Sequence, residues 1–194
     1  MALERRRWAI PGWALAFLVS CGGGGSATAP VPVQNAPLPV TFSLTSPAVV
    51  GDRLPADFTC DGTSATLPLA WGAPPAGTKA FALIMHTVAV PASGPTEIHT
   101  YWVLYDLPPT LTGLPRNVTG VGTWGINSLN GQPSYSPPCS QGPGDKTYTL
   151  TLYALSADPY LPDPSVKVTR DVLLSAIQDR TLGTATLNVV YARP

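Results

Sequence analysis

The stretch Tyr148-Thr-Leu-Thr-Leu-Tyr-Ala-Leu155 is rich in β-branched and aromatic side chains, which is typical of a β-strand. Three further stretches have this character: Phe81-Ala-Leu-Ile-Met85, Tyr101-Trp-Val-Leu-Tyr105 and the run from Thr186 to Tyr191. Proline- and glycine-rich turns separate them, and Pro108 lies just after the second. Short strands at this spacing predict a mainly β fold, a sandwich with Greek-key links.

One helix is expected near the C-terminus. Thr169 is a suitable N-cap, and Asp171 would lie at the positive end of the helix dipole. Arg180 is placed in the last turn, and Gly183 is the expected stop signal. The apolar stripe of this C-terminal helix consists of Val172, Leu173, Ala176 and Ile177.

The N-terminus has the pattern of an export signal. Arginines at positions 5–7 precede an apolar stretch, Trp8–Val19, which is shorter than the roughly 20 residues of a transmembrane helix. Leu18-Val-Ser-Cys21 resembles the bacterial lipobox, which implies a diacylated thiol on Cys21. An ordinary signal peptide, in which Cys21 is incidental, is the alternative. The expected organisation is a signal peptide over 1–20, a lipidated Gly/Ser/Pro-rich tether over 21–40 and one domain over 41–194.

These features predict an exported protein, anchored by lipid in the bacterial cell envelope. No apolar run after the signal is long enough to span a bilayer. The anchor makes the membrane a partner, because two or more acyl chains hold a protein stably where one does not. The residue after Cys21 is glycine and not aspartate, which favours the outer membrane in a host with two membranes.

The charge of the chain is small and balanced. It has 11 basic and 11 acidic residues, and removal of residues 1–20 takes away three arginines and one glutamate. The mature part therefore keeps eight basic and ten acidic residues. Because no basic patch results, nucleic acid is not an expected partner.

The chain has three cysteines. If Cys21 carries lipid, Cys60 and Cys139 remain as a pair, and an oxidising compartment favours a disulfide between them. Such a bond would close a loop of about 80 residues and would add a few kcal/mol of stability. Two separate buried thiols are the alternative.

Several motifs in a fixed order resemble the phosphatidylethanolamine-binding protein family, in its bacterial Raf kinase inhibitor-like branch. The similarity extends over about 41–193, and the two cysteines fall where many bacterial members have theirs. The motifs are Phe58-Thr-Cys-Asp-Gly62, Leu67-Pro-Leu-Ala-Trp71, Trp102-Val-Leu-Tyr-Asp-Leu-Pro108, Tyr135-Ser-Pro-Pro-Cys139 and the stretch 148–155 quoted above.

This resemblance implies two antiparallel sheets with a C-terminal helix. It also implies a small pocket that binds phosphate-like groups or phospholipid head groups, built from two acids, two histidines and a Gly-Pro turn with its tyrosine. The chain departs from this pattern at most of these positions. Thr87 and Ala89 replace the acids, Tyr101 and Lys146 replace the histidines, and Pro137 replaces the glycine, whereas Pro138 and Tyr135 are retained.

Two interpretations of the pocket stay open. In one, the pocket is rebuilt from His99, Tyr101, Tyr135 and Lys146. In the other, it is degenerate, and both histidines are incidental polar residues. His86 is expected to face away from the pocket in a regular strand, although a bulge would change this. Two histidines without a nearby carboxylate or cysteine cluster do not make a zinc site. The candidate pocket residues are Thr87, His99, Tyr101, Tyr135, Pro138 and Lys146, with His86 in second place.

No nucleophile elbow, zinc-protease motif, P-loop or Rossmann glycine pattern is present in the sequence. The expectation is a non-enzymatic binding module with no cofactor and a diverged anion pocket that binds a head group or small anion weakly. One alternative is a protein-interaction or protease-inhibitor module with an envelope protein as its partner. Another is a structural envelope lipoprotein with no small ligand.

Overall fold

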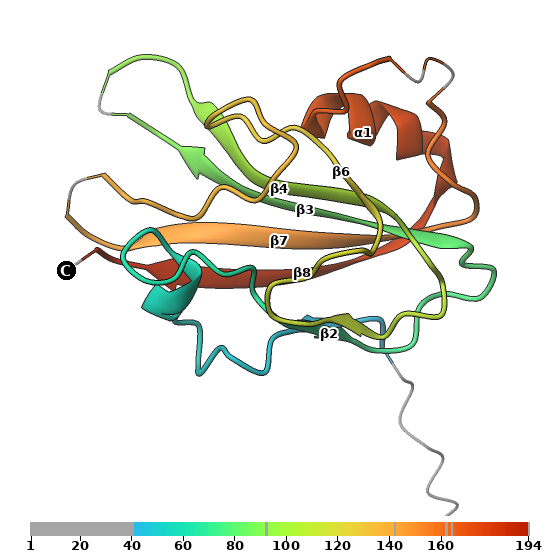
Figure 1. Cartoon of the computed structure of the whole chain (residues 1–194), viewed down its shortest axis with the longest axis horizontal. Helices are drawn as coiled ribbons and strands as arrows, with labels where there is room; N and C mark the ends of the chain where they lie inside the picture. Colours follow the sequence, from blue (N-terminus) through green and yellow to red (C-terminus); the bar gives the residue numbers. More distant parts are fainter. Residues whose placement is uncertain (1–40, 92, 142, 162, 164, 194) are drawn as a thin grey trace, which may run out of the picture. The chain divides into compact units, whose positions relative to one another are not determined.

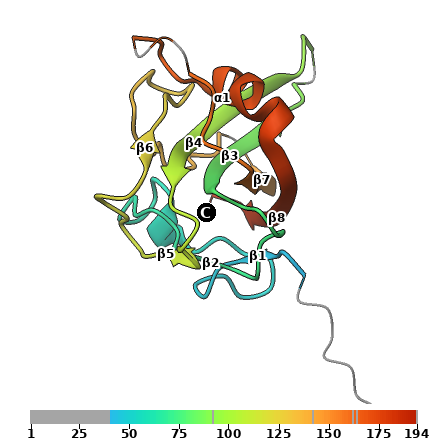
Figure 2. The ribbon, with the colours of Figure 1, turned by 90° about the vertical axis from the view of Figure 1, so that its right-hand side faces the viewer.

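The computed structural model describes residues 41–91, 93–141, 143–161, 163 and 165–193. The predicted signal peptide, Cys21 and the tether lie outside these residues. Within the described domain, a five-stranded sheet lies between a small three-stranded sheet on one face and helix α1 on the other (Figures 1 and 2).

The five-stranded sheet is fully antiparallel and has the order β6-β4-β3-β7-β8. The part β7-β3-β4-β6 has the strand order of a Greek key, which confirms the predicted link. Each of the four strands expected from sequence lies inside one of the long strands. The bounds are β3 Ala80–Ala89, β4 Glu97–Leu107, β6 Thr123–Trp124, β7 Lys146–Leu155 and β8 Thr181–Tyr191.

The second sheet is short and has the order β1-β2-β5. Its strands are β1 Leu44–Thr45, β2 Leu69–Trp71 and β5 Gly113–Leu114. A 3-10 turn, Ala56–Phe58, precedes β2 and leads into the cysteine-containing motif. Gly62 is required in this motif, because an added Cβ atom would collide with the backbone carbonyl of Ala56.

Two hydrophobic cores follow from the alternation of side chains along the strands. On β3, Phe81, Leu83 and Met85 pack between the two sheets, whereas Ala82 and Ile84 face α1. The inner core therefore joins the sheets, and the outer core attaches the helix.

Helix α1 (Arg170–Ile177) begins as predicted, because the Thr169 hydroxyl accepts a hydrogen bond from the Val172 amide at 3.4 Å. Leu173 and Ile177 of the predicted stripe are buried against the sheet. No helix of the described residues has both the length and the apolar character needed to cross a membrane.

The prediction that Gly183 stops the helix is wrong. The helix ends at Ile177, and a 3-10 turn (Gln178–Arg180) carries Arg180 past it. Gly183 lies inside β8, opposite Ala154. Glycine is needed there for close packing, because an added Cβ would lie 2.9 Å from Pro75 Cγ.

Candidate functional site: a tyrosine cluster at one end of the sandwich

A β-bulge on β4 builds the candidate site. Met85 pairs with Trp102, but His86 pairs with Thr100, so Tyr101 is an extra residue on β4. Tyr101 and Trp102 are neighbours in sequence, yet both side chains belong to the inner core. The bulge thus turns the Tyr101 ring into the inner core.

Tyr101 meets Tyr148 of β7 in this core. Their ring centroids are 5.2 Å apart and the planes are inclined by 76°, an edge-to-face contact. Both rings are buried, with exposed fractions of 7% and 1%. Tyr148 was not among the residues predicted for the pocket, although its inward position follows from the alternation of the strand on which it lies.

The loop before β7 supplies the third ring. Tyr135 packs edge-on against Trp102, with centroids 5.7 Å apart. Its hydroxyl donates a 2.7 Å hydrogen bond to the Phe58 carbonyl. The Ser136 amide donates to the Tyr101 carbonyl at 2.9 Å. These contacts hold the loop against β4 and against the 3-10 turn that precedes Cys60.

The Cys60–Cys139 disulfide fixes the same loop from the other side. The Cα atoms are 5.2 Å apart, within the limit of about 7 Å that a disulfide allows. The Cys60 amide also donates to the Pro138 carbonyl at 3.0 Å. Pro138 is buried, so this candidate residue acts in the wall of the site through its backbone.

The hydroxyls of the cluster are neutral at physiological pH. Burial raises the pKa of Tyr101, Tyr135 and Tyr148, and for the first two the neighbouring tyrosines raise it further. The Ser140 hydroxyl is buried and has no partner at hydrogen-bond geometry among the described residues. It nevertheless lies close enough to Tyr148 to oppose the rise in that pKa. The three rings therefore bring neutral hydroxyls together in a largely buried cluster.

A fourth tyrosine, Tyr191, lies near the cluster at the C-terminal end of β8, where it contributes to the raised pKa of Tyr148. The Tyr191 hydroxyl donates to Asp61 Oδ2, and Arg193 Nε donates to Oδ1 of the same carboxylate, both at 2.8 Å. Asp61 belongs to the Phe58–Gly62 motif, but sequence alone gave it no partner. Here it holds the end of β8 against the disulfide-bonded turn.

The remaining predicted residues lie around this cluster, and their polar groups do not converge on it. Thr87 and His99 are direct neighbours across β3 and β4. The Thr87 hydroxyl donates to the Thr147 carbonyl at 2.6 Å, and His99 Nε2 lies 3.6 Å from Glu97 Oε2. Lys146 is exposed, opposite Tyr191 in the register.

His86 lies on the other face of the sheet. It alternates with the inward-facing Met85, and its imidazole lies near Arg170 at the start of α1. Burial, and then the charge of Arg170, lower the pKa of His86. The bulge is in β4, so the orientation expected for His86 in a regular strand holds. No group of three or more metal-ligating side chains is found in the part of the chain that the structure describes.

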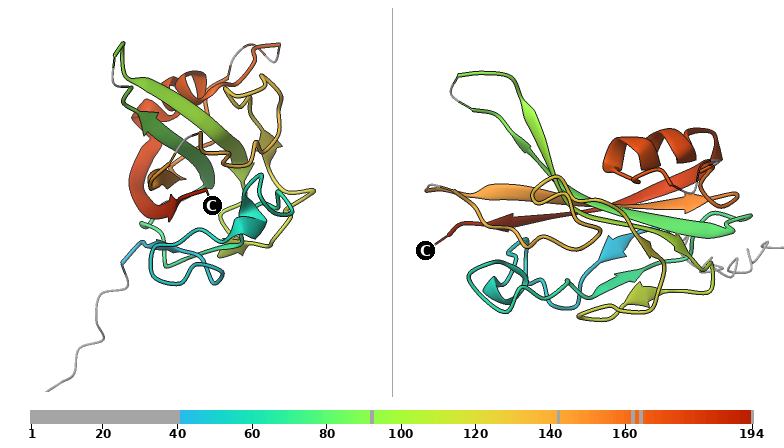
Figure 3. Two further views of the ribbon diagram at one scale, coloured as in Figure 1. Left: turned by 90° about the vertical axis from the view of Figure 1, so that its left-hand side faces the viewer. Right: turned by 45° about the horizontal axis from the view of Figure 1, so that its top comes forward.

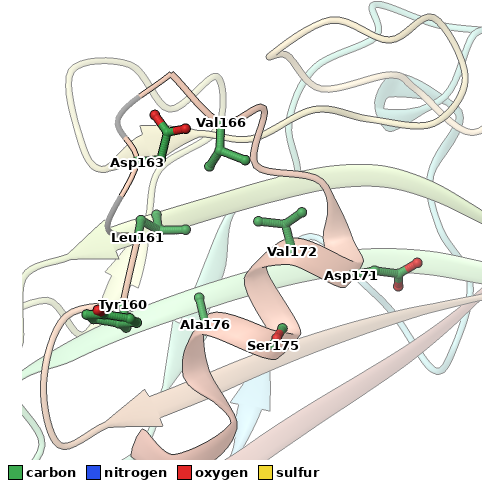
Figure 4. Close-up of a pocket in the computed structure, with 8 residues that line it drawn as sticks. All are labelled: Tyr160, Leu161, Asp163, Val166, Asp171, Val172, Ser175 and Ala176. Atoms are coloured by element: carbon green, nitrogen blue, oxygen red, sulfur yellow. The ribbon is translucent and has the colours of Figure 1, made fainter.

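Two clefts open near α1, on the face opposite to the tyrosine cluster. The first, of about 420 Å³, lies between the helix and the segment that precedes it, and is lined by Tyr160, Leu161, Val166 and Val172 among others (Figure 4). The second, of about 430 Å³, lies between the helix N-terminus and the outer face of β4 at Ile98 and Thr100. Neither includes a residue of the predicted anion pocket.

Comparisons with known proteins assign the family. The family model described as phosphatidylethanolamine-binding protein matches residues 45–192. A UPF0098 protein of Methanothermobacter thermautotrophicus is 32% identical over 146 residues, which cover 73% of this chain and 91% of the relative. A UPF0098 protein of Mycobacterium tuberculosis is 29% identical over an aligned length of 199 residues, and the alignment covers 94% of this chain and 95% of the relative.

Comparison with solved structures points to the same family fold. A putative phosphatidylethanolamine-binding protein homologue from Chlamydia trachomatis superimposes with a TM-score of 0.71 and 27% identity, covering 80% of this chain and 99% of that one. Escherichia coli YbcL, described as a member of the mammalian family, gives a TM-score of 0.67 at 21% identity and covers 79% and 99% of the two chains, which shows the shared fold. The chain belongs to the phosphatidylethanolamine-binding protein family.

Proposed function

We propose that this protein is a non-enzymatic binding module, anchored to an envelope membrane through Cys21, in which the family's anion pocket is closed to phosphate head groups. Membership of a family of binding proteins supports the first part. The lipobox-like sequence before Cys21 supports the anchor.

The contact between Tyr101 and Tyr148 carries the proposal for the pocket. An anion needs charged or well-placed hydrogen-bond donors, which contribute roughly 1.5–3 kcal/mol each. The two tyrosines instead bring buried, neutral rings into edge contact. Lys146 is the lysine among the predicted pocket residues, and it is exposed to solvent at the start of β7.

Nuclear magnetic resonance with inorganic phosphate tests this pocket. The backbone amide signals of Tyr101, Tyr148 and Ser140 should not move at phosphate concentrations up to about 1 mM. A dissociation constant of about 1 mM corresponds to about 4 kcal/mol of binding free energy, so any binding should be weaker than this. Saturable shifts confined to these amides would show that the anion site is open.

Cell fractionation tests the anchor. The wild-type chain should sediment with membranes, and Cys21→Ser should either release the domain or leave the signal peptide uncut. Mass spectrometry should find the mature N-terminus at Cys21 with acyl chains attached. An unmodified Cys21 or a cleavage at another residue would refute the anchor but would leave the account of the pocket unaffected.

A protein partner is a second candidate function, favoured by the long β3–β4 hairpin. This hairpin extends beyond the neighbouring strands (Figure 3). Val88 and Ile98 are paired across it, so they share a face, and 53% and 44% of their surfaces are exposed. Exposed apolar side chains that share a face of a protruding hairpin offer a small contact surface for a protein partner. Site-specific photo-crosslinking at Ile98 in cells should give one discrete adduct, with Thr147 as the exposed control position.

A further inference from the structure

Strand β8 forms one edge of the five-stranded sheet (Figure 2). It is paired with β7 along nearly its whole length of 11 residues. On its other side, the only described backbone partner is the segment Asp52–Leu54. The Val190 amide donates to the Asp52 carbonyl at 2.7 Å, and the Leu54 amide donates to the Val190 carbonyl at 2.9 Å.

These two bonds show which backbone groups of β8 point away from β7. In an antiparallel ladder, alternate residues direct both backbone groups to the same side. Since the amide and carbonyl of Val190 point away from β7, those of Thr184, Thr186 and Asn188 point away from β7 too. Hydrogen bonds among the described residues leave the amides and carbonyls of these three unused. We call this segment, Thr184 to Asn188, the open edge.

The open edge lacks the features that keep sheet edges from pairing. Proteins protect such edges with lysine or other charges, with proline, or by covering them. From Thr181 to Tyr191 the strand has neither a charged residue nor a proline. The side chains of Thr184, Thr186 and Asn188 are all exposed, on the face of the sheet opposite to the inner core.

We propose that the open edge is an interface between two copies of this chain, which pair antiparallel about a two-fold axis at Thr186 to form one continuous sheet. In this register Thr186 faces its own counterpart, and Thr184 faces Asn188 of the other copy. All three residues then use both backbone groups. The Thr186 pair across the axis adds a side-chain hydrogen bond, whereas Asn188 Oδ1 already accepts one from the Thr149 hydroxyl at 2.9 Å.

Charge and shape favour a second copy as the partner. The domain has eight basic and ten acidic residues, so repulsion between identical domains is weak. The register shift at Ala154 and Leu155 leaves Leu182 outside the ladder. A bulge of this kind bends the strand, so each chain can leave the interface before it meets the other copy's Asp52–Leu54 segment. The proposal does not depend on the lipid anchor.

Disulfide trapping in the full chain tests this arrangement. Directly opposed residues of a hydrogen-bonded antiparallel pair have Cα atoms about 5.5 Å apart, which suits a disulfide. Thr186→Cys, treated with a copper–phenanthroline oxidant in membranes and in extracts, should shift to twice the monomer mass on a non-reducing gel. Thr184→Cys alone should not, whereas Thr184→Cys combined with Asn188→Cys should.

Two controls separate specific pairing from collision. Thr147→Cys places an exposed thiol on β7, away from the edge. It should run at the monomer mass on the non-reducing gel, as should the wild-type chain, because neither has a thiol at the interface that could link the two copies covalently. Adding Thr184→Pro to Thr186→Cys should abolish the dimer, because proline removes an outward amide without touching the β7 ladder. Circular dichroism should show that both variants are folded. Equal trapping at 186 and 147, or trapping that survives Thr184→Pro, would overturn the proposal.

Discussion

Tyr101 lies edge-on to Tyr148, 5.2 Å between ring centroids, because a bulge in β4 turns Tyr101 into the core beside Trp102. The resemblance to the family predicts a histidine at this position, and the tyrosine found in its place has a clear role in packing. Tyr101 is part of the packing between the two sheets.

The first prediction concerns this packing. Tyr101→Ala should lower the free energy of unfolding by about 3 kcal/mol, since truncation of a buried aromatic ring leaves a cavity. Tyr101→Phe keeps the ring and should lower it by about 1 kcal/mol or less. Urea unfolding monitored by tryptophan fluorescence measures both. A loss below about 1 kcal/mol for Tyr101→Ala would mean that the ring is not packed as described.

The second prediction concerns alkaline pH. Burial raises the pKa of Tyr101, Tyr135 and Tyr148 above that of an unfolded tyrosine, which is about 10. Between the unfolded and folded pKa values the unfolded state binds fewer protons, so the free energy of unfolding falls as pH rises. These groups contribute no pH dependence below about pH 9 and a steep loss above about pH 10. Urea midpoints at several pH values measure this loss, and Tyr135→Phe should make it shallower. A pH-independent midpoint through this range would contradict the burial of the hydroxyls.

The third prediction concerns the Cys60–Cys139 disulfide. The two residues are separated by 79 positions, and in the chain-entropy model a bridge over a loop of this length stabilises by about 4 kcal/mol. Reduction, or Cys60→Ser combined with Cys139→Ser, should lower the free energy of unfolding by an amount of this order. An unchanged urea midpoint under reducing conditions, with free thiols confirmed by mass spectrometry, would show that the bridge contributes no stability.

Sequence reasoning identified the parts of this fold that follow from local pattern. Runs of β-branched and aromatic residues identified the long strands, and Thr169 identified the start of α1. The disulfide was inferred from the cysteine count, the compartment and the resemblance to the family. Gly183 was misread because glycine has two uses, ending a helix or permitting close packing inside a strand, and only the position of Pro75 distinguishes them.

The site could be predicted only in part. Tyr101, Tyr135 and Pro138 were identified by their alignment with family motifs. Tyr101 packs against Tyr148 and Tyr135 against Trp102, whereas the Pro138 carbonyl accepts a hydrogen bond from the Cys60 amide. The bulge could not be foreseen, because a single inserted residue leaves no local signal in a run of large side chains. The contacts of Tyr148 with Tyr101 and of Asp61 with Tyr191 join residues far apart in sequence, so they depend on the sheet register.

The most direct measurement of the central claim is a calorimetric titration of the protein with phosphoethanolamine. Loss of two charged partners should weaken binding by roughly 3 kcal/mol, or about a hundredfold, and the Tyr101 ring takes up space in addition. The account predicts no saturable heat at ligand concentrations up to about 1 mM. Submillimolar binding that Tyr101→Ala or Lys146→Ala abolishes would contradict it, because the pocket would then be rebuilt around these side chains and not closed.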